Sequence, residues 1–124
     1  VFFHGRQDNN YVLDYLPNAN FVLINSYYET FSVITIEALS FGKPVLSTKC
    51  GGPEELIDNN SGKLIDLNNQ NLLIDSVEWM LNNYNSFDSN KIRNSVHNKY
   101  SPEIIGNMFN DIFNKTFDDL LSNK

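Results

Sequence analysis

Two glutamates set eight residues apart are the residues of this sequence best placed to do chemistry. Glu29 follows a short apolar run, and Glu37 lies inside the next segment of helical apolar spacing. Eight residues of helix rise roughly 12 Å, which is close to the length of a nucleoside diphosphate sugar. An ionised carboxylate accepts hydrogen bonds through two oxygens, so it can hold both hydroxyls of a vicinal diol. Glu37 is therefore predicted to hold a ribose and Glu29 a hexose.

The residues between these acids are predicted to open the helix. The backbone N–H groups of Phe31, Ser32 and Val33 lie in its first turn, where free N–H groups and the helix dipole suit a diphosphate. One loop would then bind ribose, pyrophosphate and sugar in order. Simpler interpretations stay open: Glu29 also suits a capping acid, and Glu37 has apolar neighbours that suit a buried structural acid.

The elements that must position this loop alternate between strands and helices. Short apolar runs predict buried strands, and apolar residues at helical spacing predict helices. Such alternation predicts a parallel sheet with right-handed crossovers, whose ligands lie beyond the carboxyl ends of the strands. The fold class is therefore α/β, a Rossmann-like parallel sheet with flanking helices and a helical C-terminal tail. Strands are expected at residues 1–4, 21–24, 44–47 and 62–65, and helices over 12–16, 33–41, just after 51–52, and around 72–81, 92–100 and 104–121.

Composition excludes several classes of protein. A length of 124 residues allows one domain at most, and a 41% hydrophobic fraction supplies a core. The net charge of −6 argues against binding nucleic acid. Cys50 is the only cysteine, which excludes a disulfide framework and fits a reducing cytoplasm. No apolar run has the length of a membrane span. No pair of histidines at helical spacing and no Asp-x-Asp cluster occurs, so no metal site is predicted.

The segment from Ser26 to Leu39 resembles the glutamate-x7-glutamate motif of the retaining glycosyltransferases with the GT-B fold, glycosyl transferases group 1. This family includes sucrose- and glycogen-synthase-like enzymes and many bacterial polysaccharide transferases. The resemblance covers roughly residues 1–81. Further landmarks of the family follow in order, namely Phe3-His4-Gly5, Pro44-Val45-Leu46-Ser47, Gly51-Gly52 with Glu55, and Gly62-Lys63-Leu64-Ile65.

The resemblance implies a role for each matching residue. Glu29 would be the catalytic acid that faces the donor sugar near the reacting carbon, and Glu37 would bind the ribose. Backbone amides of the residues between them would meet the phosphates, and Ser32 takes a position that is often glycine. The predicted donor-binding set is Gly5, Thr30, Phe31, Ser32, Val33 and Glu37.

The resemblance also implies the function of the whole protein. It would transfer a hexosyl group, with retention, from a UDP- or GDP-sugar to a glycan or lipid acceptor in the synthesis of bacterial polysaccharides or cell-surface glycans. No cofactor is expected. In the family, an Arg and Lys pair and the acceptor-binding domain precede the position of Val1, so the chain alone is expected to be inactive. Any peripheral attachment to a membrane is expected only through that domain.

The same resemblance predicts one domain in two parts. Residues 1–85 would form the nucleotide-sugar-binding core, incomplete at its N-terminus, and residues 86–124 its C-terminal helices. Without the partner domain, some apolar residues of the last helix are expected to be exposed or buried in a dimer contact. These residues are Phe109, Phe113, Phe117 and Leu121.

Other functions stay open. A sugar-nucleotide epimerase shares the architecture but needs acids and histidines from a second domain. A phosphorylase needs a lysine region for pyridoxal phosphate, for which the sequence has no clear candidate. A non-catalytic nucleotide-binding fragment would keep the fold without the chemistry. A dinucleotide-dependent dehydrogenase is disfavoured, because no GxGxxG follows a strand.

Overall fold

One parallel sheet of three strands organises the chain. The computed structural model describes residues 1–122, with side chains as far as Asp118. The sheet has the order β1-β2-β3, formed by Val22–Ile24, Val45–Thr48 and Gly62–Ile65. The helices are α1 (Asn9–Tyr15), α2 (Val33–Ser40), α3 (Gly52–Leu56), α4 (Gln70–Asn83), α5 (Ser89–Tyr100) and α6 (Pro102–Ser122), with short 3-10 turns at Leu16–Asn18 and Tyr84–Ser86.

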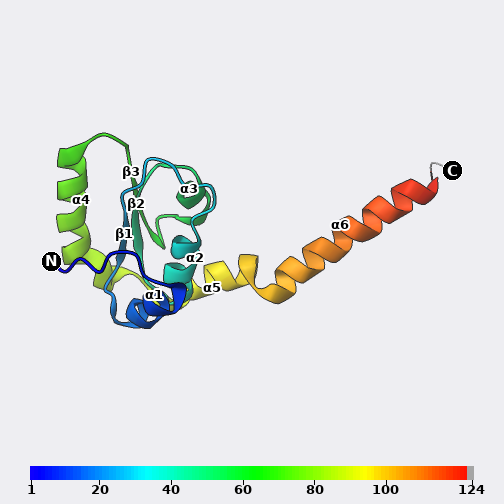
Figure 1. Ribbon diagram of the computed structural model, residues 1–124, viewed down its shortest axis with the longest axis horizontal. Helices are drawn as coiled ribbons and strands as arrows, with labels where there is room; N and C mark the ends of the chain where they lie inside the picture. Colours follow the sequence, from blue (N-terminus) through cyan, green and yellow to red (C-terminus); the bar gives the residue numbers. More distant parts are fainter. Residues whose placement is uncertain (123–124) are drawn as a thin grey trace.

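Helices cover both faces of the sheet, and β2 lies at its centre. In Figure 1, α4 lies on one side of the strands and α2 with α3 on the other. Successive residues of β2 point to opposite faces. Val45 accordingly packs into a cluster with α2 and α5, whereas Leu46 packs with Met80 of α4. This arrangement confirms the predicted α/β fold with a parallel sheet and flanking helices.

A glycine sets the spacing between β2 and β3. Gly62 pairs with Val45 in the parallel register, and a Cβ built on Gly62 would lie 1.9 Å from the Val45 carbonyl oxygen. The turn before it is held by Asp58, whose Oδ1 accepts hydrogen bonds from the Ser61 hydroxyl at 2.8 Å and the Asn60 N–H at 2.9 Å. The Ser61 hydrogen bond lowers the pKa of the Asp58 carboxyl below its ordinary value.

The expected strand over residues 1–4 is wrong. This segment pairs with no strand of the described chain, and Phe2 and Phe3 are 88% and 95% exposed. An apolar run becomes a strand only where a neighbour satisfies its backbone and a layer covers its side chains. Neither condition is met for residues 1–4 within the described chain.

The last helix extends away from the sheet (Figure 1). The expected exposure of its apolar residues is confirmed, because Phe109, Phe113 and Phe117 are 56%, 68% and 63% exposed. Leu121, named with them, lies outside the residues whose side chains are described. Across residues 1–122, none of the helices combines the length and apolar character needed to cross a membrane.

Candidate functional site

The loop that carries Glu29 is bound to the loop that follows β2. The Glu29 N–H donates to the Cys50 carbonyl at 2.8 Å, and the Gly52 N–H donates to the Glu29 carbonyl at 2.8 Å. Glu29 and Gly51 thereby form a parallel bridge that continues the pairing of β1 with β2 beyond the strands. The structure thus places Glu29 at the carboxyl edge of the sheet, where ligands of parallel α/β sheets bind.

The two glycines after β2 let these loops approach closely. Gly51 has a φ of 103°, and a Cβ added there would lie 2.6 Å from the Glu29 carbonyl oxygen. A Cβ on Gly52 would lie 2.6 to 2.8 Å from backbone atoms of Phe31. No residue with a side chain fits in either place without moving the loop. The paired glycines therefore fix the position of residues 29–31.

A hydroxyl orients the Glu29 carboxylate. The Ser26 hydroxyl donates to Glu29 Oε1 at 2.8 Å, and the Ser26 carbonyl accepts a hydrogen bond from the Thr48 hydroxyl at 2.6 Å. Thr48 is buried in β2, so the serine is anchored to the sheet. No ion pair of the described residues includes Glu29. Its Oε2 is left free to accept hydrogen bonds from a ligand.

The backbone just before α2 has a conformation that is usually found at glycine. Ser32, just before the helix, has φ 60° and ψ 73°, the left-handed conformation. Its buried hydroxyl is hydrogen bonded to the Thr35 hydroxyl at 2.8 Å. Within residues 1–122, no hydrogen bond uses the N–H of Phe31, Ser32 or Val33. Three unpaired donors therefore lie beside one another at a helix N-terminus.

Substitution of Ser32 measures the strain of this turn. Ser32→Ala and Ser32→Gly both lose the hydroxyl that binds Thr35. Alanine, however, has a steric cost in the left-handed conformation that glycine does not have. We expect the glycine variant to be more stable than the alanine variant by about 1 kcal/mol. Urea denaturation of the two proteins side by side measures the difference. Equal midpoints would mean that the left-handed turn costs nothing, contrary to this interpretation.

The other predicted donor-binding residues lie in different surroundings. Glu37 is partly buried in the second turn of α2, and its carboxylate makes no hydrogen bond or ion pair among residues 1–118. Thr30 and Val33 are exposed in the loop and at the first residue of the helix. Gly5 lies instead on an exposed turn before α1, with φ 64° and no atom within 4 Å of an added Cβ. Residues 29–37 form one loop and helix start at the edge of the sheet, and Gly5 belongs to a separate segment before α1.

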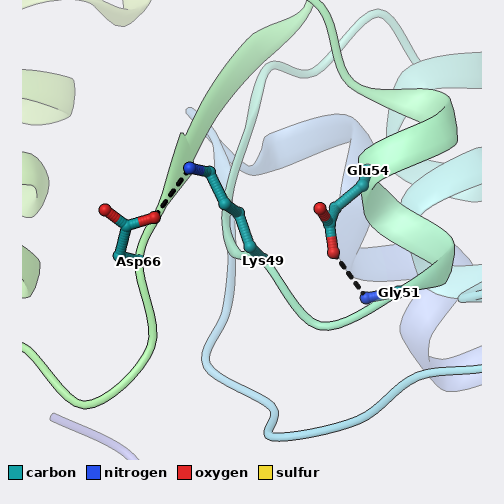
Figure 2. Close-up of polar contacts among 4 residues, drawn as sticks. All are labelled: Lys49, Gly51, Glu54 and Asp66. Atoms are coloured by element: carbon teal, nitrogen blue, oxygen red, sulfur yellow. Dashed lines mark hydrogen bonds and ion pairs between the residues drawn. The ribbon is translucent and has the colours of Figure 1, made fainter.

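A second pair of loops at this edge is held by polar contacts. The Lys49 ammonium lies 2.6 Å from Asp66 Oδ1 and links the residues that follow β2 and β3 (Figure 2). This hydrogen bond raises the pKa of Lys49. In the same view, Glu54 Oε1 accepts a hydrogen bond from the Gly51 N–H at 2.9 Å, so the first turn of α3 fixes the glycine loop.

Sequence reasoning named Ser26 and Gly52 only as parts of the motif and its landmarks, without a role in the site, and it missed Thr48. The signal was available, since all three lie at or just beyond the carboxyl ends of neighbouring parallel strands. Among the described residues, no group of three or more His, Cys, Asp or Glu side chains is arranged to hold a metal ion.

Comparisons with known proteins identify the family and the fold. The profile of the family Glycosyl transferases group 1 matches residues 1–98. The N-acetyl-alpha-D-glucosaminyl L-malate synthase of Bacillus anthracis is 27% identical over 116 residues, which are 91% of this chain and 30% of that protein.

Two solved structures show the same fold. Sucrose-phosphate synthase from Thermosynechococcus elongatus superposes with a TM-score of 0.83 at 26% identity, over 96% of this chain and 31% of its own. Anabaena HepE, solved in complex with UDP, superposes with a TM-score of 0.72 at 18% identity, over 81% of this chain and 29% of its own.

The chain thus spans about a third of the length of each of these three proteins. The family profile covers both glutamates, the loop between them and all three strands of the sheet. The structures that superpose on the chain are glycosyltransferases of the GT-B fold. This chain therefore belongs to the family Glycosyl transferases group 1.

Proposed function

We propose that this chain is the donor-binding domain of a retaining hexosyltransferase that uses a nucleoside diphosphate sugar. One observation carries the proposal. In the described part of the chain, the carboxylates of Glu29 and Glu37 form no ion pair, and three N–H groups in the sequence between them have no hydrogen-bond partner. Glu37 would accept both ribose hydroxyls, and the N–H groups of residues 31–33 would bind the pyrophosphate. The free oxygen of Glu29 would accept hydrogen bonds from the hexose.

The same groups would help the reaction. During transfer, the bond from the anomeric carbon to the diphosphate oxygen breaks, and a bond to an acceptor oxygen forms on the same face of the sugar. The proton of the acceptor hydroxyl passes to the departing diphosphate. Negative charge then gathers on the leaving diphosphate, where backbone donors at a helix N-terminus stabilise it. The Glu29 carboxylate, held by Ser26, faces the sugar ring, which becomes positively charged as that bond breaks.

The finer assignments complete the proposal. The donor would be a UDP- or GDP-sugar, and the UDP bound to the Anabaena relative supports the first of these. The acceptor would be a glycan or lipid used for bacterial polysaccharides or cell-surface glycans. A second domain of the same protein would contribute the acceptor-binding surface and the Arg and Lys that neutralise the diphosphate, and the enzyme would act in the cytoplasm.

Binding of free nucleotides tests the donor site. Titration of the 15N-labelled chain with UDP, and separately with GDP, should shift the amide signals of residues 31–33. Glu37→Gln removes the charge that accepts the ribose hydroxyls, so we expect binding at least about tenfold weaker. Glu103→Gln, which changes an exposed acid at the start of α6, is the matched control. Equal binding by wild type and Glu37→Gln would contradict the proposed role of Glu37.

A further inference from the structure

One hydroxyl controls the orientation of the Glu29 carboxylate. Within residues 1–118, only Ser26 forms a hydrogen bond with this carboxylate, and its hydroxyl donates to Oε1 at 2.8 Å. Both residues are half-buried, so water competes with this bond only in part. A glutamate side chain has three torsions and many conformations. A hydrogen bond to one oxygen selects among them and sets where the other oxygen, Oε2, meets a ligand.

Ser26 is itself held by the central strand of the sheet. The hydroxyl of Thr48, the last residue of β2, donates to the Ser26 carbonyl at 2.6 Å. All four residues of β2 are buried, and Thr48 is 3% exposed. A side chain in a close-packed interior has little freedom to move. Thr48 therefore fixes residue 26 relative to the sheet.

The other end of the same short loop is held by the segment after β2. The Glu29 N–H donates to the Cys50 carbonyl, and the Gly52 N–H donates to the Glu29 carbonyl, both at 2.8 Å. The backbone is thus bound at residue 26 and again at residue 29. With both ends fixed, the side-chain torsions of Glu29 are the main freedom left to its carboxylate, and the Ser26 hydroxyl restrains those.

We propose that Ser26 is a positioning residue for Glu29, supported by Thr48, and that the two set the affinity for the donor's sugar. This inference rests on the proposed transferase function. A side chain that is ordered only on binding lowers the affinity, because its lost freedom opposes association. With the carboxylate already in place, Oε2 accepts a hydrogen bond from a hexose hydroxyl without that cost.

The second acid of the loop offers an internal comparison. The Glu37 carboxylate makes no hydrogen bond or ion pair among residues 1–118, so it does not depend on Ser26. Loss of the serine hydroxyl should therefore disturb the group that is proposed to bind the hexose and spare those proposed to bind the nucleotide. Affinity for the sugar and affinity for the nucleotide should separate in Ser26 variants.

The test measures the binding of UDP, UDP-glucose and UDP-N-acetylglucosamine to the 15N-labelled chain. The dissociation constant for UDP divided by that for a UDP-sugar gives the affinity that the sugar adds. Ser26→Ala should lower this ratio about fivefold to tenfold, the effect of one hydrogen bond to a charged group, and should leave the affinity for UDP within about twofold. Ser26→Thr keeps a hydroxyl on the same Cβ and should restore the ratio.

Three further variants complete the set. Ser95→Ala also removes a half-buried hydroxyl, which donates to the Ile92 carbonyl at 2.8 Å in α5, and it should bind all three ligands as wild type does. Thr48→Val removes the supporting hydroxyl with little change of shape and should lower the ratio at least about threefold, whereas Thr48→Ser should lower it less. In a Glu29→Ala protein, adding Ser26→Ala should have no further effect, because no carboxylate is left to position.

The possible failures can be told apart. If Ser26→Ala weakens the binding of UDP and of the UDP-sugars equally, the serine only holds the loop together and the positioning role is overturned. The role is also overturned if Ser26→Ala lowers the ratio as far in the Glu29→Ala protein as in wild type. The proposed function fails instead if UDP does not shift the amide signals of residues 31–33, or if Glu29→Ala keeps the wild-type ratio for both sugars. Either of these last results would also remove the basis of the positioning role.

Discussion

Replacing Gly62 by alanine is expected to lower the free energy of unfolding by at least about 3 kcal/mol. The new Cβ would lie 1.9 Å from the carbonyl oxygen of Val45 and 3.0 Å from its nitrogen. Both are backbone atoms of the central strand, which cannot rotate aside as a side chain can. The strands β2 and β3 must separate, with loss of ladder hydrogen bonds between them.

Chemical denaturation followed by circular dichroism measures this effect. Gly106→Ala is the matched control, because no heavy atom lies within 4 Å of an added Cβ there and the residue is inside α6. Alanine in a helix interior is more favourable than glycine. The free energy of unfolding of the control should therefore be unchanged or higher by up to about 1 kcal/mol. A Gly62→Ala protein as stable as this control would show that the sheet spacing is wider than described.

Replacing Gly52 by alanine is expected to weaken UDP binding at least about tenfold while the sheet stays folded. The added Cβ would lie 2.6 Å from the Phe31 carbonyl carbon and 2.8 Å from its nitrogen. The loop must therefore move away, taking with it the N–H groups proposed to bind the diphosphate. Positions of binding groups matter strongly, because a displacement near 1 Å can cost roughly a hundredfold in the rate of a reaction.

Two measurements separate the local effect from a global one. Amide signals of residues 22–24 and 45–48 should keep their wild-type positions, whereas those of residues 29–33 should move. We expect a loss of stability of about 1 to 3 kcal/mol, so the titration is done well below the melting temperature. Glu103→Ala alters an exposed residue at the start of α6 and should bind UDP normally. Unchanged UDP binding by Gly52→Ala would show that the glycine loop does not position the groups that bind UDP.

Much of the fold could be predicted from local sequence. The last strand was predicted over the residues it occupies, Gly62–Ile65, because a glycine marks its start and a short apolar run marks its end. The helix α2 also begins at Val33 as predicted. The helix α1 is capped by Asp8, whose side chain accepts from the Tyr11 N–H. The two asparagines that follow, Asn9 and Asn10, can also cap a helix, so only the backbone conformation decides among the three residues.

The failures share one physical cause, the dependence on distant parts of the chain. Residues 1–4 have the apolar character of a strand, yet a strand needs a partner that local sequence does not supply. The spacing of Glu29 and Glu37 identified the candidate loop, but the bond from Ser26 and the contact with Gly52 depend on β1 and β2 lying side by side.

The ion pair between Lys49 and Asp66 makes the spacing of two loops sensitive to ionic strength. Both side chains are well exposed, at 50% and 69%, and dissolved salt screens such pairs. In dilute buffer the pair would tether the segments beyond β2 and β3, whereas in concentrated salt they would separate more freely.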